Sequence, residues 1–183
     1  MRIPKIVSLK EEMSLILKLG EILKKDGFNA ENSAIITVST DYSSMIGQIL
    51  RHYLSYEGEI CDGFGIDVPY PDEKWDWEYS SRLYKIFDAH KEILFQKKGN
   101  PYNLELKENK IPILVEAAVI RGGNYNFLVD WIQNSFKYKG KIITVALYEN
   151  SKSKFKSNYV GSYYNDDESD LTFWWEKDNK HWK

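Results

Sequence analysis

Two apolar runs, each followed by a loop or turn and then by apolar residues at helical spacing, constrain the fold of this chain most. The first run spans residues 34–39 and leads into a helical pattern over 45–53. The second spans residues 111–115 and leads through a turn at 121–124 into another helical pattern. Runs that are apolar throughout are typical of strands buried on both faces of a parallel sheet. The chain is therefore predicted to be an α/β protein, with a parallel sheet flanked by helices and ligands at the carboxyl ends of the strands.

Periodicity and turn residues predict the remaining elements. A first helix is predicted over 13–23 and stops at Gly27, and Ser43 or Ser44 is predicted to cap the helix over 45–53. The other predicted elements are a strand around 59–67, an irregular loop over 68–79, a helix over 79–97, and a strand over 141–148. The tail after Asn150 is expected to cover an edge of the sheet, because about 33 residues are too few for a separate core.

Size and charge exclude several classes of protein. The 183 residues fit one domain, and a formal charge of −2 from 25 basic and 27 acidic residues argues against a nucleic-acid partner. The one cysteine, Cys61, forms no internal disulfide, and no cysteine and histidine cluster has the spacing of a zinc site. The N-terminal segment carries charges where a signal peptide needs an apolar stretch, and no run of about 18 apolar residues occurs. The chain is therefore expected to be cytoplasmic, without a membrane partner.

The glycine turn belongs to a segment that contains a conspicuous acid. Residues 113–124 read Ile-Leu-Val-Glu-Ala-Ala-Val-Ile-Arg-Gly-Gly-Asn. This segment resembles the signature of type I phosphoribosyltransferases, in which an apolar strand precedes two acids, two apolar residues, two small polar residues, two glycines and a Ser or Thr. Glu116 keeps the first acid, whereas Ala117 replaces the second, and Ile120 and Arg121 replace the small polar residues.

The resemblance implies a role for each part of the loop at 116–125. It implies that Glu116 is the catalytic acid that approaches the ribose hydroxyls of phosphoribosyl pyrophosphate (PRPP). It also implies that the 5′-phosphate is held by the turn and the start of its helix, formed by Arg121, Gly122, Gly123, Asn124 and Tyr125. The pyrophosphate would bind the loop after the first strand, made of Ser39, Thr40, Asp41 and Tyr42. Mg²⁺ is implied only for an active transferase, in which it would neutralise the leaving group.

The tail contains Tyr159-Val160-Gly161 and, further on, Phe173-Trp174-Trp175-Glu176. These segments resemble the end of purine phosphoribosyltransferases of the xanthine and guanine kind. The resemblance implies one phosphoribosyltransferase-like domain over residues 1–183, with a core at 33–150 and a small hood formed by 151–183. It implies that three aromatic residues contact a purine-like base, namely Tyr159, Phe173 and Trp174. Residues 70–77 would then correspond to the lid over the sugar.

Two functions are compatible with these residues. The chain is either a glycosyltransferase that moves the phosphoribosyl group to a purine-like base, or a catalytically inactive member of the fold. An inactive member would sense or sequester a nucleotide, or would bind a protein partner. Ala117 and a pyrophosphate loop without glycine or a basic residue favour the second hypothesis.

Plainer interpretations stand beside these hypotheses. Gly122 and Gly123 fit a turn that needs only backbone freedom, and Asp41 and Tyr42 fit a helix-capping loop. No metal-binding residues are predicted, since the acidic run at 166–170 is interpreted as a solvated turn. An unrelated α/β domain is a third alternative, and a homodimer is left open.

Overall fold

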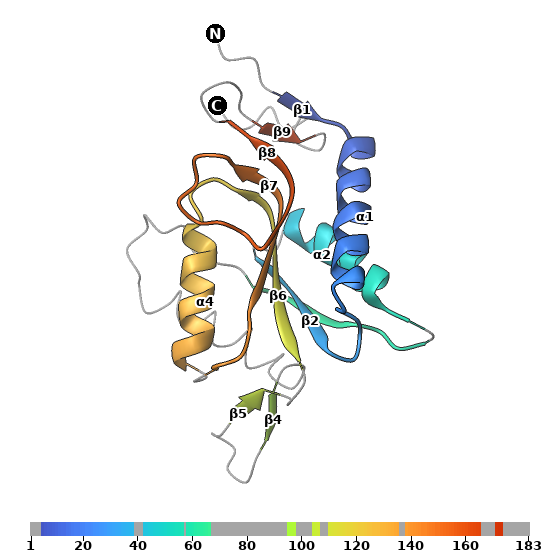
Figure 1. Cartoon of the computed structure of the whole chain (residues 1–183), viewed down its shortest axis with the longest axis vertical. Helices are drawn as coiled ribbons and strands as arrows, with labels where there is room; N and C mark the ends of the chain where they lie inside the picture. Colours follow the sequence, from blue (N-terminus) through green and yellow to red (C-terminus); the bar gives the residue numbers. More distant parts are fainter. Residues whose placement is uncertain are drawn as a thin grey trace.

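A five-stranded parallel sheet forms the centre of the molecule (Figure 1). The computed structural model describes residues 5–38, 42–56, 58–66, 95–97, 104–106, 110–135, 138–165 and 171–173. The strands lie in the order β3-β2-β6-β7-β8, with the bounds Asp62–Ile66, Ser33–Val38, Ile111–Val119, Ile143–Asn150 and Tyr159–Tyr164. Each neighbouring pair of strands is parallel. The predicted α/β fold with a parallel sheet is therefore confirmed.

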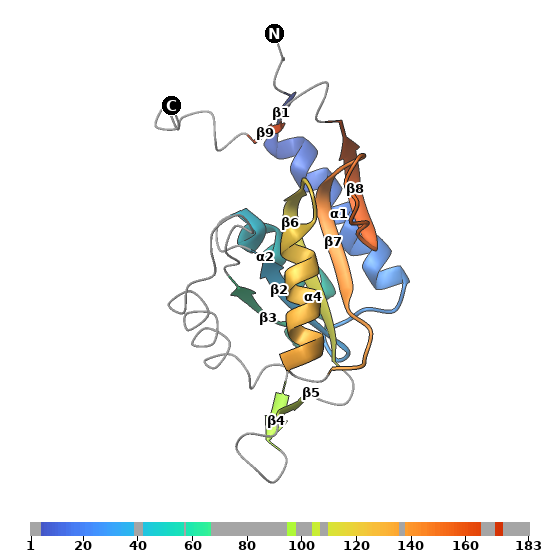
Figure 2. The ribbon, with the colours of Figure 1, turned by 90° about the vertical axis from the view of Figure 1, so that its left-hand side faces the viewer.

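Helices cover both faces of this sheet, as Figure 2 shows. Two of them, α1 (Leu9–Lys25) and α2 (Tyr42–Leu54), lie on one face, and α4 (Gly123–Ser135) lies on the other. Each helical layer encloses its own apolar cluster against the sheet. Along β6, Val115 belongs to the cluster under α1 and α2, whereas its neighbour Leu114 belongs to the cluster under α4. Successive side chains of a strand point to opposite faces, so one apolar strand supplies both layers.

The helix ends follow the local sequence at α1 but not at α2. Ser8 Oγ accepts a hydrogen bond from the Glu11 amide at 3.2 Å, and beyond the other end Gly27 has a φ of 92°. The prediction that Ser43 or Ser44 caps the next helix is wrong, because α2 already begins at Tyr42. Ser43 faces the sheet from inside the helix, where its hydroxyl accepts a hydrogen bond from a backbone N–H of β6.

Two short sheets lie apart from the central one. β1 (Lys5–Val7) pairs in parallel with β9 (Leu171–Phe173), so segments from the two ends of the chain lie side by side (Figure 1). β4 (Phe95–Lys97) pairs antiparallel with β5 (Leu104–Leu106). The predicted helix over 79–97 is therefore wrong at its last 3 residues, because hydrogen bonding to β5 requires extended backbone there. The rest of that segment and the predicted loop at 68–79 lie outside the described residues.

The tail after Asn150 covers one edge of the sheet, as predicted, because β8 pairs with β7 as the outermost strand. The hood at 151–183 stays a prediction. No helix in the described ranges combines the length and the apolar content that crossing a bilayer requires.

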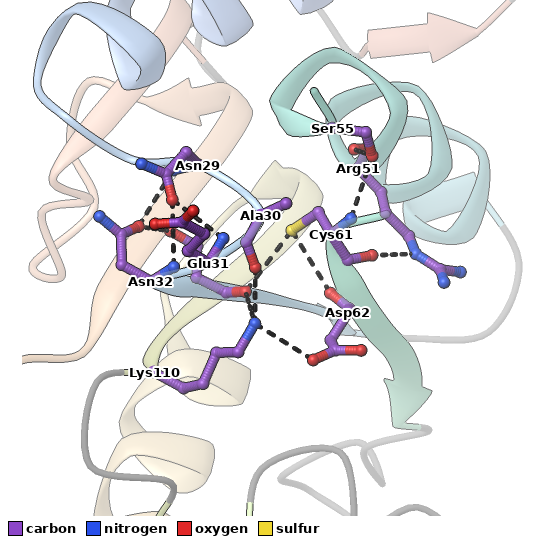
Figure 3. Close-up of polar contacts among 10 residues, drawn as sticks. Asn29, Ala30, Glu31, Asn32, Arg51, Ser55, Cys61, Asp62 and Lys110 are labelled. Carbon is purple, nitrogen blue, oxygen red and sulfur yellow. Dashed lines mark hydrogen bonds and ion pairs between the residues drawn. The ribbon is translucent and has the colours of Figure 1, made fainter. Parts of the chain in front are cut away.

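At the amino-terminal edge of the sheet, Lys110 joins three strands (Figure 3). Its Nζ donates to the Ala30 carbonyl oxygen at 2.6 Å and lies 3.2 Å from Asp62 Oδ2 at the start of β3. The Cys61 thiol is buried beside it, 3.5 Å from the Ser33 carbonyl oxygen, and burial raises the pKa of this thiol to about 11. These contacts fix where β2, β3 and β6 begin. They therefore help to set the register in which the opposite ends of these strands meet.

Candidate functional site

Glu116 lies within β6 rather than in the loop that follows it. The sequence predicts a strand over 111–115, but β6 continues to Val119. The residues after Glu116 are apolar, and their pairing with β7 extends the strand. The connection to the helix is short, since α4 begins at Gly123, and Arg121 in this connection is exposed to solvent.

Gly122 is required at its position for two reasons. Its φ is 80°, in the left-handed region that L-residues with a side chain seldom adopt. In addition, a Cβ at this position would lie 2.7 Å from Cγ of Phe155 and closer still to its Cβ. Sequence reasoning missed Phe155, because nothing in the lysine-rich segment around it indicates contact with the glycine turn. The glycine therefore serves packing as well as backbone freedom.

The start of α4 presents backbone N–H groups to the carboxyl edge of the sheet. The first bond of the helix runs from the Asn126 amide to the Gly122 carbonyl oxygen at 3.0 Å. The amides of Gly123, Asn124 and Tyr125 therefore precede the intrahelical ladder, at the positive end of the helix dipole. Such a helix start favours a bound anion, in particular a phosphate.

The side chain of Tyr125 lies away from this helix start. It is fully buried beneath α4, and its hydroxyl donates to the Val145 carbonyl oxygen of β7 at 2.6 Å. Burial raises the pKa of this phenol well above its ordinary value. Tyr125 can therefore offer a ligand only its backbone N–H, whereas Arg121 offers a solvent-exposed guanidinium.

Glu116 is the buried acid of the site. Only 9% of the residue is exposed, and its Oε1 accepts a hydrogen bond from Asn124 Nδ2 at 2.7 Å. Its Oε2 is buried and has no hydrogen-bond partner among the described residues. Burial raises the pKa of Glu116 to about 7, although the hydrogen bond from Asn124 lowers it. Near neutral pH the carboxyl group is thus divided between its two protonation states, and one of its oxygens has no hydrogen-bond partner among the described residues.

Ala117, which stands where the resembled signature has its second acid, is part of the hydrophobic core. Its side chain belongs to the cluster under α1 and α2, on the face of β6 opposite to Glu116. Its backbone N–H donates to Ser43 Oγ of α2 at 3.1 Å. The acid is therefore replaced by a residue that α2 covers. Sequence reasoning missed this role of Ser43, which depends on a contact between residues 74 positions apart.

The predicted pyrophosphate loop follows β2, the strand next to β6. Because parallel strands end at the same edge of a sheet, the carboxyl end of β2 at Val38 and the glycine turn share that edge. Ser39, Thr40 and Asp41 lie outside the described residues, and Tyr42 is the first residue of α2.

The structure does not bring Tyr159 together with Glu116. Tyr159 opens β8 and packs against the cluster on the α1 face, whereas the Asn124 contact lies on the α4 face. Its hydroxyl donates to Asp26 Oδ2 at 2.7 Å, and burial together with this acid raises the pKa of the phenol to about 12. Of the other predicted base-binding residues, Phe173 ends β9 and pairs with β1, and Trp174 lies outside the described residues.

A cavity of about 270 Å³ lies elsewhere, around the carboxyl end of α1 and the segment that leads into β2. Its lining includes Lys24, Phe28, Glu31 and Tyr56, and none of the predicted site residues. Lys24 Nζ lies 5.8 Å from the centroid of the Tyr56 ring, so the ammonium group of this cavity already has an aromatic partner. The carboxyl edge of the sheet is the better candidate, because it combines a glycine turn, a helix start and a buried Glu116 oxygen without a hydrogen-bond partner among the described residues.

Comparison with solved structures finds the same fold in purine phosphoribosyltransferases. The purine phosphoribosyltransferase of Pyrococcus horikoshii Ot3 matches with a TM-score of 0.61 at 15% sequence identity, over 94% of this chain and 93% of its own. The xanthine-guanine-hypoxanthine phosphoribosyltransferase of Helicobacter pylori matches with a TM-score of 0.61 at 15% identity, over 98% and 97%. A hypothetical protein of Neisseria gonorrhoeae with bound ppGpp matches with a TM-score of 0.62 at 16% identity, over 96% and 90%.

Sequence comparisons find no such relative. No family model matches the chain, and no curated protein matches it. The altered residues of the signature are consistent with that result, since Glu116 and the two glycines are what the loop retains. The structural matches nevertheless cover nearly the whole length of each chain. By the order of its strands and by these matches, the chain has the fold of the type I phosphoribosyltransferases.

Proposed function

We propose that the chain binds a ligand with a 5′-phosphorylated ribose, either PRPP or a nucleoside monophosphate, at the carboxyl edge of its sheet. The observation that carries this proposal is the pair formed by Glu116 and Asn124. A buried carboxyl group with one unpartnered oxygen is joined by a 2.7 Å hydrogen bond to the first turn of a helix that follows a glycine turn. Leaving a buried carboxyl oxygen unsatisfied is costly because of its desolvation, so a ligand hydroxyl that bonds to it would be favoured.

The two parts of the site suit the two parts of such a ligand. The N–H groups of Gly123, Asn124 and Tyr125 would hold the phosphate, and Arg121 would add charge from the solvent side. Glu116 Oε2 would face the ribose hydroxyls. A hydroxyl both donates and accepts hydrogen bonds, so it can pair with either protonation state of a carboxyl group whose pKa is about 7.

As a transferase, the protein would direct a purine nitrogen to the anomeric carbon of PRPP. A bond from the nitrogen to that carbon would form, and the bond from the carbon to the pyrophosphate oxygen would break. Pyrophosphate would leave with the electron pair, and the proton of the purine nitrogen would pass to solvent. Positive charge gathers on the ribose in such a step, and the ionised form of Glu116 would stabilise it. Without a second acid at position 117, this stabilisation would come from one carboxylate.

Mg²⁺ would neutralise charge on the pyrophosphate. No three His, Cys, Asp or Glu residues gather to hold a metal ion within the described part of the chain. Magnesium commonly binds through one or two carboxylates together with the phosphates of a substrate. Because the free oxygen of Glu116 would face the ribose hydroxyls, the phosphate oxygens of the ligand would hold the ion here.

A nucleotide-binding protein without transferase activity is the second candidate, and Ala117 favours it. This residue is packed in the core under α2. The site therefore lacks the second acid of the signature, and the core fills the position where that acid would stand. The Neisseria protein of similar fold, which is described as hypothetical and has ppGpp bound, supports a nucleotide as the ligand.

Calorimetry with PRPP and Mg²⁺, with guanosine 5′-monophosphate (GMP) and with guanosine tests the proposal. We expect PRPP or GMP to bind and guanosine to bind more weakly. If neither PRPP nor GMP binds at millimolar concentration, the proposed function is wrong. Release of pyrophosphate from PRPP that depends on an added purine base would identify a transferase, and binding without release would identify the second candidate.

The Asn124→Asp variant tests the location of the phosphate. It keeps the size of the side chain but replaces the donor to Glu116 Oε1 by a second carboxyl group, so at alkaline pH the pair carries more negative charge beside the helix start than Glu116 carries alone. Repulsion should weaken GMP binding roughly tenfold. Asn134→Asp adds the same charge at an exposed position near the other end of α4 and should leave the affinity for GMP unchanged.

A further inference from the structure

The loop between β7 and β8, residues 151–158, packs against the glycine turn (Figure 1). Its residue Phe155 lies against Gly122 and leaves no room for a Cβ there. The Phe155 ring also lies on the Tyr125 ring, with 5.1 Å between the centroids and 40° between the planes. One aromatic side chain thus contacts both the last residue before α4 and the first turn of that helix.

This loop is held by hydrogen bonds from both of its ends. Glu149 near the end of β7 is fully buried, and its Oε2 accepts a hydrogen bond from the Ser157 amide at 2.8 Å. Its Oε1 lies 3.6 Å from Lys156 Nζ, which also donates to the Ser151 carbonyl oxygen at 3.1 Å. Phe155 therefore projects from a loop whose neighbouring residues are fixed to a buried carboxylate.

The base of the loop is tied to β7 as well. Asn158 Oδ1 accepts hydrogen bonds from the Thr144 amide at 2.9 Å and from the Thr144 hydroxyl at 3.1 Å. The backbone amide of Asn158 in turn donates a hydrogen bond to Thr144 Oγ1 at 3.0 Å. These bonds leave the loop little freedom to carry Phe155 away from Gly122.

We propose that Phe155 is a positioning residue for the phosphate site: it holds Gly122 in its left-handed conformation and so aims the first amides of α4 at the ligand. The inference rests on the proposed function. Without such a neighbour Gly122 has more freedom to change its backbone conformation, and each change turns the following N–H groups in another direction. Hydrogen-bond donors that are fixed before binding do not have to be ordered by the ligand.

A role in core packing alone is the competing explanation, and the contribution of the phosphate to affinity separates the two. We define this contribution as the ratio of the affinities for GMP and guanosine. Phe155→Ala should lower the ratio roughly tenfold, because displaced amides lose the phosphate but not the nucleoside. Phe155→Leu refills much of the apolar volume and should restore most of the ratio.

Tyr138→Ala is the matched control. Tyr138 and Phe155 are both partly buried aromatic residues that pack against the apolar cluster under α4, but Tyr138 lies near the carboxyl end of that helix. It should lower the melting temperature without changing the ratio of affinities. If Phe155→Ala does not fold, Phe155→Leu and Phe155→Met take its place, and an order of effect that follows side-chain shape supports the proposal.

The possible results distinguish a failure of the proposed function from a failure of the inference about Phe155. Wild-type protein that binds no GMP overturns the proposed function, and the inference falls with it. Wild-type protein that prefers GMP over guanosine, together with a Phe155→Ala variant that folds and keeps the same preference, overturns the inference alone. A reduced preference in Phe155→Ala and in Tyr138→Ala alike would show that Phe155 acts only through packing, which also overturns it.

Discussion

Asn124 donates a hydrogen bond to Glu116 across 2.7 Å, from the first turn of α4 to the middle of a buried strand. The two residues are 8 positions apart, and the glycine turn lies between them. The bond joins the acid of the site to the helix start, and it opposes the effect of burial on the pKa of Glu116. The protonation of the acid and the position of the helix are therefore linked through one amide side chain.

Replacing Asn124 by alanine should raise the pKa of Glu116 above its present value of about 7. The hydrogen bond stabilises the ionised carboxylate, and the variant loses that bond while most of the burial remains. A titration that follows the side-chain carboxyl carbon by NMR would measure the pKa. Asn134→Ala removes an exposed amide far along α4 and should leave it unchanged. A pKa that falls in Asn124→Ala would mean that water replaces the lost donor.

Stability should depend on pH through Glu116. Its pKa is raised from 4.5 to about 7 in the folded protein, so the folded state binds a proton more tightly than the unfolded state does. The stability from this proton is present below pH 4.5 and is lost as the pH rises to about 7. Glu116→Gln does not titrate, so between these limits the wild-type protein should lose about 3 kcal/mol relative to it. Urea unfolding of both proteins across this range measures the difference, and parallel curves would contradict the assignment.

Regular elements with strong periodicity could be predicted from the sequence. The buried strands β2 and β7 and the helix α1 lie where apolar runs and helical spacing indicate them. The glycine turn before α4 could also be predicted, because it follows a strand and opens a helix. Local chemistry decides these features, so a local pattern is enough to find them.

Contacts between distant residues could not be predicted in this way. Ser43 Oγ accepts a hydrogen bond from the Ala117 backbone amide, which lies 74 positions away in the sequence. A serine that the sequence predicts to cap a helix therefore binds the sheet instead. Phe155 packs on Gly122 from a loop that reads only as lysine-rich. The segment Phe95–Lys97 ends a stretch whose apolar spacing predicts a helix, but its pairing with β5 decides its structure. In each case the tertiary partner outweighs the local pattern.

Gly122→Ala should destabilise the protein more than Gly27→Ala does. Both glycines have a positive φ, but a Cβ at Gly27 meets nothing within 4 Å, whereas one at Gly122 overlaps with Phe155. Gly27→Ala should cost about 1–2 kcal/mol for the backbone conformation alone. Gly122→Ala should cost about 1–3 kcal/mol more, because the packed loop must shift. Urea unfolding of the two variants measures both values, and equal costs would mean that the loop gives way without resistance.

Lys110→Met should weaken the amino-terminal edge of the sheet. Only 13% of the Lys110 side chain is exposed, and it bonds the Ala30 carbonyl oxygen at 2.6 Å while pairing with Asp62 (Figure 3). Its loss leaves two polar groups without their partner and should cost about 1–3 kcal/mol. Lys139→Met changes an exposed lysine and should cost less than about 0.5 kcal/mol. Denaturant unfolding gives both values, and a Lys110→Met variant as stable as the control would mean that water replaces the ammonium group.

Ala117→Asp, which restores the second acid of the signature, should destabilise the fold and should not create transferase activity. Ala117 is only 8% exposed and lies in the cluster under α1 and α2, so an ionised carboxylate there is buried among apolar side chains. The cost should be at least about 3 kcal/mol at pH 8 and smaller at pH 4, where the acid is neutral. Ala117→Asn has the same size without a titrating group, so its cost should not change with pH.

The activity of this variant separates the two candidate functions. A side chain at position 117 points to the face of β6 opposite to Glu116, so a new carboxylate would not join the acid that faces the ligand. We therefore expect no purine-dependent release of pyrophosphate from PRPP by Ala117→Asp. Release by a variant that is still folded would mean that the end of β6 can turn this side chain toward the ligand. It would also mean that the alanine at position 117 alone accounts for the missing transferase activity. Its absence, in a protein that still binds GMP, would favour a site built for binding around a core alanine.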